Sequence, residues 1–101
     1  MMETEKYFDL PIHTYLETSF QQVCLNLARY RKERKLTQEE LAELTGISRD
    51  HIAHLEAPGS VSLPSLDAVF TIAYHLRIPA YFFYMREEDW NLTEDEEAEE
   101  P

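Results

Sequence analysis

The sequence has one cysteine, two glycines and no long hydrophobic run. A single cysteine, Cys24, cannot form a disulfide within the chain, which is typical of proteins from a reducing compartment. A membrane-spanning helix needs about 18 or more apolar residues in succession, and no segment approaches that length. The first ten residues, MMETEKYFDL, lack the basic and apolar regions of a secretory signal. We therefore expect a cytoplasmic protein with no membrane partner.

Basic residues are also scarce, because 9 Lys and Arg stand against 20 Asp and Glu, for a net charge of −11. The imbalance is local. Residues 87–101 hold nine acidic residues and no Lys or Arg, and residues 1–19 hold four acidic residues and one Lys. Residues 20–86 hold eight basic and seven acidic residues, a balance of +1. The central segment can therefore bind nucleic acid despite the acidic whole, and we expect residues 94–100 to be disordered in solution.

The apolar residues recur at helical spacing, and no alternating strand pattern is found, so the sequence predicts an all-α fold. Steps of three and four predict a first helix from Ile12 to about Glu33, and shorter patterns predict helices over 37–45, 48–56, 64–76 and 79–84. The first helix follows Ile12, Leu16, Phe20, Val23, Leu27 and Tyr30.

Residues 36–56, LTQEELAELTGISRDHIAHLE, predict two short helices joined by a tight turn. Thr37 is a good N-cap and Glu40 follows at capping-box spacing. Gly46 tolerates the left-handed backbone that ends a helix, and Ser48 can cap the next one. This arrangement of small, apolar and glycine positions resembles the helix-turn-helix of phage repressor/Cro-type proteins, the XRE family.

The resemblance covers roughly residues 23–84 and implies a five-helix domain that binds DNA. We expect an N-terminal helical extension over residues 1–19, the helix-turn-helix domain over 20–86 and an acidic C-terminal tail over 87–101. In this family the second helix of the pair enters the major groove of double-stranded DNA, usually as a homodimer. The resemblance thus implies a DNA-binding transcriptional regulator of an inverted-repeat operator.

Carried over position by position, the family's contacts fall on the following residues: Thr37, Gln38, Ser48, Arg49, Asp50, His51, His54 and Lys35. Arg49 would donate two hydrogen bonds to guanine, and Asp50 would accept from cytosine or hold Arg49. His54 would reach a base or a phosphate, and His51 would lie nearer the backbone. Gln38 would contact a phosphate at the start of its helix. The basic cluster Arg29–Lys35 would add phosphate contacts, although a solvated helix end also explains it.

Arg31 and Glu56 correspond to an ion pair that ties the first helix to the end of the recognition helix in this family. The loop over residues 57–63 departs from the family, because it carries no charge where many members have phosphate-gripping residues. Phosphate binding should then lean on the basic cluster, on Gln38 and on a dimer.

Aromatic residues concentrate beyond the fourth predicted helix, and exposed aromatic surface usually marks an interface. We expect the dimer interface to comprise Tyr81, Phe82, Phe83, Tyr84 and Trp90. The alternative is that the N-terminal segment, with Tyr7, Phe8, Ile12 and Tyr15, folds back over this cluster.

Other functions have weaker support. His51 and His54 lie three residues apart beside Asp50, but a groove-facing helix explains them, so we expect no metal or cofactor. No Gly-rich phosphate loop or supported Ser/His/Asp arrangement indicates an enzyme. Two rivals remain, an antitoxin that neutralises a protein partner, and a protein-interaction module whose DNA face has decayed.

Overall fold

The chain folds into four α-helices and two short 3₁₀-helices over the residues that the computed structural model describes, which are 6–57, 59 and 64–86. In chain order these are η1 (Lys6–Asp9), α2 (Ile12–Glu33), α3 (Gln38–Thr45), α4 (Arg49–Glu56), α5 (Leu66–Leu76) and η2 (Ala80–Tyr84). No strand occurs among them, so the predicted all-α class is confirmed for this part of the chain. None of the described helices is both long and apolar enough to cross a membrane.

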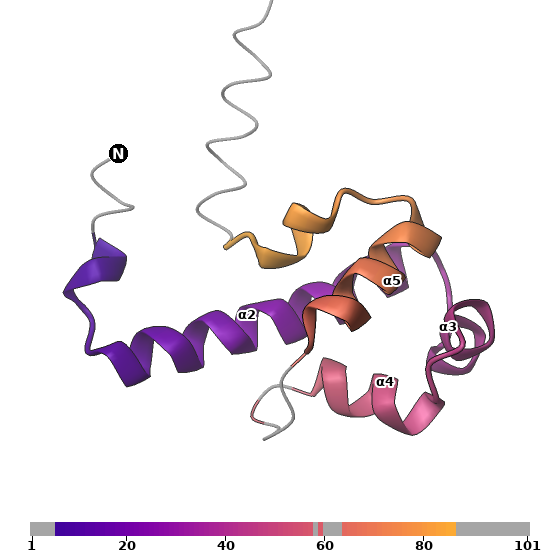
Figure 1. Cartoon of the computed structure of the whole chain (residues 1–101), viewed down its shortest axis with the longest axis horizontal. Helices are drawn as coiled ribbons and strands as arrows, with labels where there is room; N and C mark the ends of the chain where they lie inside the picture. The colour runs from indigo at the N-terminus through magenta and orange to yellow at the C-terminus, as the bar shows by residue number, and fades with distance from the viewer. Residues whose placement is uncertain (1–5, 58, 60–63, 87–101) are drawn as a thin grey trace, which may run out of the picture.

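The 22-residue helix α2 is the longest element and organises the others (Figure 1). Its C-terminal half packs against α4, α5 and η2, and its N-terminal half projects away from them. The helix runs without a break across the boundary predicted near residue 19. Its predicted span, from Ile12 to about Glu33, is confirmed.

One hydrophobic core joins α2, α3, α4, α5 and η2. Its fully buried side chains come from every one of these elements: Leu27, Leu41, Ile52, Leu55, Val69, Ile72 and Phe83. Tyr30 and Phe83 meet edge to face with ring centroids 5.0 Å apart, a favourable aromatic geometry. This core holds α3 and α4 at a fixed angle to the rest of the domain.

The last two predicted helices differ from the structure. Residues 80–84 form a 3₁₀-helix, so the five helices expected of the domain are not confirmed as five α-helices. Pro79 precedes it and the chain is extended again at Met85, which leaves too few residues for a stable α-helical ladder. The fourth helix begins at Leu66 because Ser65, not Pro64, is its N-cap and accepts a hydrogen bond from the Ala68 amide. At the N-terminus, residues 6–9 form a short 3₁₀-helix before α2 begins.

A buried amide fastens η2 to α2. The Asn26 side chain is fully buried and donates from Nδ2 to the backbone oxygens of Phe83 and Met85, at 3.0 and 2.8 Å. Its Oδ1 accepts from Gln22 Nε2 at 3.0 Å. These bonds satisfy carbonyls that a short 3₁₀-helix leaves unpaired at its end. Asn26 therefore sets where the chain leaves the domain, a role that sequence reasoning missed.

Candidate nucleic-acid interface

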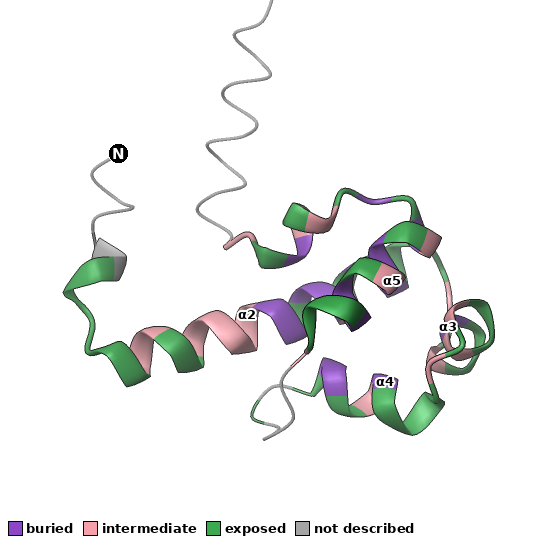
Figure 2. Ribbon diagram, in the orientation of Figure 1, coloured by how far each residue is buried: buried purple, intermediate pink, exposed green. Residues whose placement is uncertain are grey.

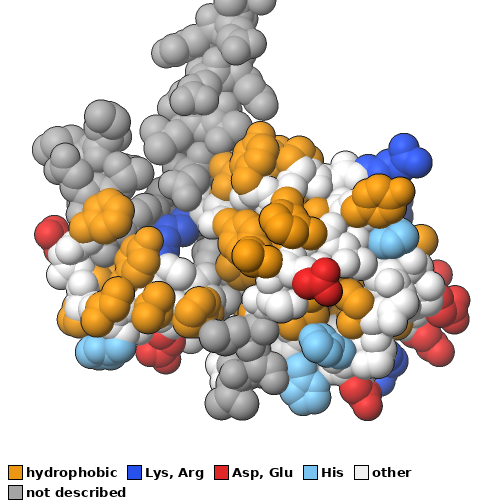
Figure 3. All heavy atoms as spheres, in the orientation of Figure 1, with side chains coloured by type: hydrophobic (Ala, Val, Ile, Leu, Met, Phe, Trp, Pro, Cys, Tyr) orange, Lys and Arg blue, Asp and Glu red, His pale blue; other side chains and the backbone are white. Residues whose placement is uncertain are grey.

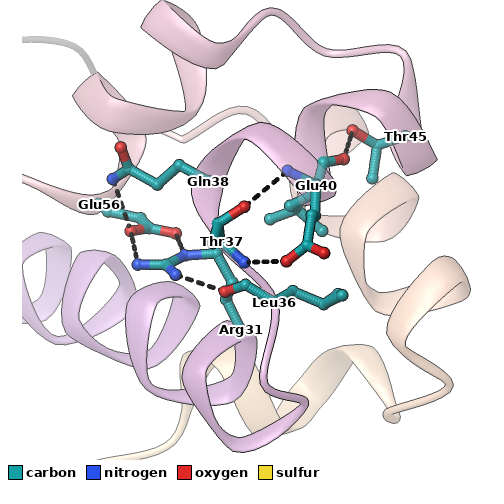
Figure 4. Close-up of polar contacts among 8 residues, drawn as sticks. Arg31, Leu36, Thr37, Gln38, Glu40, Thr45 and Glu56 are labelled. Carbon is teal, nitrogen blue, oxygen red and sulfur yellow. Dashed lines mark hydrogen bonds and ion pairs between the residues drawn. The ribbon is translucent and has the colours of Figure 1, made fainter.

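The first helix of the pair, α3, begins with the predicted capping box. The Glu40 amide donates to Thr37 Oγ1 at 3.0 Å, and the Thr37 amide donates to Glu40 Oε1 at 2.8 Å (Figure 4). The helix ends at Gly46, whose φ of 82° lies in the left-handed region that glycine tolerates without strain. Both ends of α3 are thus fixed by local chemistry that the sequence reveals.

The turn into α4 is equally well determined. Thr45 Oγ1 donates to the Leu41 carbonyl at 2.8 Å and accepts from the Ile47 amide at 3.2 Å. Ser48 then caps α4, because its Oγ accepts from the His51 amide at 3.1 Å. The Ser48 hydroxyl already has this structural role, and it also lies exposed at the start of α4.

Helix α4 has one buried and one exposed side. Ile52, Leu55 and Glu56 face the domain, and the exposed side carries Arg49, Asp50, His51 and His54 (Figure 2). Its N-terminal turn is the part that is most exposed. A short helix that is anchored along one side and offers polar side chains on the other can enter a DNA groove.

A family model described as "Helix-turn-helix" matches residues 27–83, more than half of the chain. The chain belongs to the XRE-type helix-turn-helix family. It is therefore a DNA-binding regulator of the XRE type, and the family is not an enzyme family. The matched segment begins inside α2 and ends in η2, so it covers α3, α4 and α5 but not the projecting half of α2. A comparison with curated proteins finds no match.

In this XRE-type domain a buried ion pair holds α4 against α2. Arg31 donates from Nε and Nη2 to the two oxygens of Glu56, at 2.7 and 2.9 Å, and from Nη1 to the Leu36 carbonyl at 2.7 Å (Figure 4). Both charged side chains are buried. A paired geometry of this kind fixes orientation more than it adds stability, because both charges lose hydration. The contact joins the end of α2, the start of the pair and the end of α4.

Gln38 also belongs to this network, which sequence reasoning missed. Its Nε2 donates to Glu56 Oε1 at 3.0 Å, so the carboxylate receives a further hydrogen bond from α3. The amide nitrogen carries a second N–H, and the first backbone amides of α3 point out of its N-terminus. The structure thus gives Gln38 a positioning role beside the phosphate contact that the family resemblance implies.

The basic cluster Arg29–Lys35 is divided between internal and external roles. Arg29 lies 3.4 Å from Glu33, Arg31 is buried with Glu56, and Arg34 Nε donates to the Leu76 carbonyl at the end of α5 at 3.0 Å. Lys32 and Lys35 are exposed, and no ion pair involving them is found in the described part of the chain. Lys35 has φ of 59°, so the backbone turns sharply there between α2 and α3.

The exposed side chains of α4 do not all have equal freedom. His54 Nδ1 lies 2.7 Å from the backbone oxygen of Asp50. A carbonyl only accepts, so the ring donates from Nδ1, and Nε2 is the ring nitrogen that this bond leaves unused. In the described residues no group of three His, Cys, Asp or Glu side chains could hold a metal ion.

The aromatic residues expected at a dimer contact are only partly available on the surface of the protomer. Phe83 is fully buried in the protomer, and Phe82 is partly buried against the core. Both rings lie against the Tyr30 ring of α2. Only Tyr81 and Tyr84 remain exposed, and Trp90 lies outside the described residues. The N-terminal segment does not cover these two tyrosines enough to bury them, and Phe8 itself is exposed.

Proposed function

We propose that this chain is a transcriptional regulator that reads a specific operator with α4 in the major groove and binds an inverted repeat as a homodimer. The observation that carries the proposal is the exposed N-terminal turn of α4, which projects Arg49 and Asp50 from a helix anchored by the Arg31–Glu56 pair. An anchored helix presents the same side chains to every operator, as base readout demands.

Each exposed residue has a role that follows from its chemistry. Arg49 has the planar fork that matches guanine O6 and N7 in the major groove. Asp50 accepts from a cytosine amino group, and His54 offers Nε2 to a base or phosphate. Thr37 and Lys35 flank the N-terminus of α3, where backbone amides favour a phosphate.

The affinity of a single domain for the DNA backbone should be modest. The loop over residues 57–63 has no charged residue, and three of the five side chains in the basic cluster are already paired with other groups of the protein. Lys32 and Lys35 remain for phosphate contact, so few counterions are released by each protomer. Two copies on one inverted repeat would combine the weak contacts of each half-site.

Selection of bound fragments from a genomic DNA pool tests the function directly. We expect enrichment of an inverted repeat whose half-sites are separated by one helical turn, about 10 bp, or a multiple of it. Footprinting of the enriched fragments should then protect both half-sites. A pool in which no sequence is enriched at about 50 mM salt, where backbone contacts are strongest, would refute sequence-specific binding.

A further inference from the structure

The apolar stripe of α2 continues beyond the domain that it helps to build. Val23 and Leu27 are 9% and 1% exposed, but Ile12 and Leu16, on the same side of the helix, are 69% and 42% exposed. Figure 2 shows this change along α2, from buried at its C-terminal half to exposed at its N-terminus. The sequence thus repeats a core pattern over two turns for which the described elements supply little cover.

A hollow lies beside this projecting half of α2. Its volume is about 530 Å³, and its lining is mostly apolar: Phe8, Tyr15, Phe20, Val23, Leu66 and Tyr84. Arg86 lines one side, where it donates to Ser19 Oγ and lies over the Tyr15 ring with its guanidinium 5.4 Å from the centroid. These contacts connect the segment after η2 to α2 and leave the hollow walled by aromatic surface.

The exposed apolar surface continues from the hollow over α5. Leu66, Phe70 and Tyr74 are spaced by four residues, so they form one outward stripe, and all three are exposed. Figure 3 shows hydrophobic side chains gathered in two groups on one face, one over the N-terminal half of α2 and one over the rest of the domain. Phe8, which is 75% exposed, and Ile12 and Leu16 extend this apolar surface past the hollow to η1 and the N-terminal half of α2.

We propose that a second copy of this chain covers the surface formed by Phe8, Ile12, Leu16, Leu66 and Phe70. This assignment rests on the proposed homodimer and names the surface that makes it. The surface has both a projecting half-helix and a hollow beside it. In a pair related by a two-fold axis, the projecting half of α2 of each copy can therefore pack into the hollow of its partner. The stripe itself carries no charge, so it suits an apolar partner rather than a charged one.

The arrangement also leaves the DNA face open. The exposed side chains of α4 lie on another element, and none of them lines the hollow. A symmetric pair through the projecting halves of α2 would therefore present two recognition helices at once. This is the requirement that an inverted repeat imposes on a dimeric reader.

Two leucines on α2 form a matched pair for the test. Leu16 and Leu25 are 42% and 49% exposed, and nine residues separate them, which is about two and a half turns, so they lie on opposite sides of the helix. In sedimentation velocity of the full chain without DNA, the wild type and Leu25→Glu should dimerise alike. Leu16→Glu should raise the dimer dissociation constant at least tenfold, because the two-fold axis buries two unpaired carboxylates. Circular dichroism should show equal helix content in all three.

A photocrosslinking side chain at position 12 gives a second measurement that does not depend on folding of a variant. It should yield covalent dimer in the wild-type background, whereas the same group at position 25 should not. A wild type that stays monomeric at about 100 μM, or equal dissociation constants for Leu16→Glu and Leu25→Glu, would overturn the assignment. A monomer that reads DNA with α4 would still enrich a single half-site in the operator selection. Failure of this dimer surface is therefore distinguishable from failure of α4 to read DNA.

Discussion

Arg49 is the first residue of α4, and its side chain is exposed on the side of the helix away from the core. We expect Arg49→Ala to weaken binding to the selected operator by about 1–3 kcal/mol and to relax the preference at one base pair, because a bidentate guanine contact is lost. Fluorescence anisotropy with operator variants at each position measures both effects.

Lys35→Ala is the matched control for Arg49. Its exposed side chain carries the same charge but lies at the turn before α3. Its loss should weaken binding to all DNA sequences alike and lower the slope of log affinity against log salt concentration by about one. Equal operator affinity for wild type and Arg49→Ala would remove Arg49 from the base-reading set.

Tyr30 makes the stability of the domain sensitive to alkaline pH. Its burial raises the pKa of the phenol from 10 to about 12, with nearby Arg29 opposing and Glu33 adding to the shift. Between these two pKa values the folded state retains a proton that the unfolded state has lost. The stability that Tyr30 contributes is therefore fully present below pH 10 and is lost as the pH rises toward 12.

The variant Tyr30→Phe isolates this effect. The wild type should lose more free energy of unfolding between pH 9 and 11 than Tyr30→Phe does, as measured by urea unfolding followed by circular dichroism. Other groups also titrate in this range, so the difference between the two proteins is the quantity that counts. Parallel curves of unfolding free energy against pH for the two proteins would show that Tyr30 does not contribute to the loss of stability at alkaline pH.

Single residues differ in how far their roles can be predicted from sequence. Thr37, Gly46 and Ser48 act on backbone groups within three or four positions, so spacing alone predicts them. Gln38 and Arg34 bond to groups at least 18 positions away in the chain. A partner chosen by tertiary packing leaves no mark on local spacing, so neither of these bonds could be predicted from the sequence.

At the scale of elements, periodicity predicts the α-helices and fails for the segment after them. Residues 80–84 are aromatic enough to suggest a helix, but their conformation is set by Pro79 and by the bonds from Asn26 to Phe83 and Met85. Asn26 lies three residues after Val23 and four before Tyr30, beside two core positions of α2, and a polar residue at such a position is the signal that could have revealed a long-range contact.

Replacing Asn26 tests how firmly η2 is held. Asn26→Ala should lower the free energy of unfolding by about 2–4 kcal/mol, because it leaves the Phe83 and Met85 carbonyls without their donor. Gln22→Ala is the control, since it removes only the bond that Asn26 Oδ1 accepts and should cost less than about 1 kcal/mol. Urea unfolding gives both values. Similar losses for the two variants would contradict the proposal that the bonds from Asn26 hold η2 against α2.

At the scale of the whole molecule, the exposed polar side chains and the apolar stripes lie on different elements. The polar side chains are on α4, the apolar stripes are on α2 and α5, and nine acidic residues occur in the sequence of residues 87–101. The acidic segment was recognised from composition alone, and it lies outside the described residues. The surface proposed for the dimer could not be predicted from sequence, because Leu16 and Leu27 belong to one periodic pattern and only tertiary packing distinguishes them.

The acidic segment should act on DNA binding through charge. Six carboxylates between positions 94 and 100 can compete with phosphates for Lys32 and Lys35, which are exposed. Truncation after Thr93 should then tighten non-specific DNA binding at about 10 mM salt, where the Debye length is ~30 Å, and leave it nearly unchanged near 1 M, where it is ~3 Å. Replacing the six carboxylates with Gln and Asn keeps the length and should reproduce the truncation. Identical binding isotherms for the full and truncated chains at both salt concentrations would show that the acidic segment does not compete with DNA. Its remaining role would be solubility, because its negative charge makes copies of the chain repel one another.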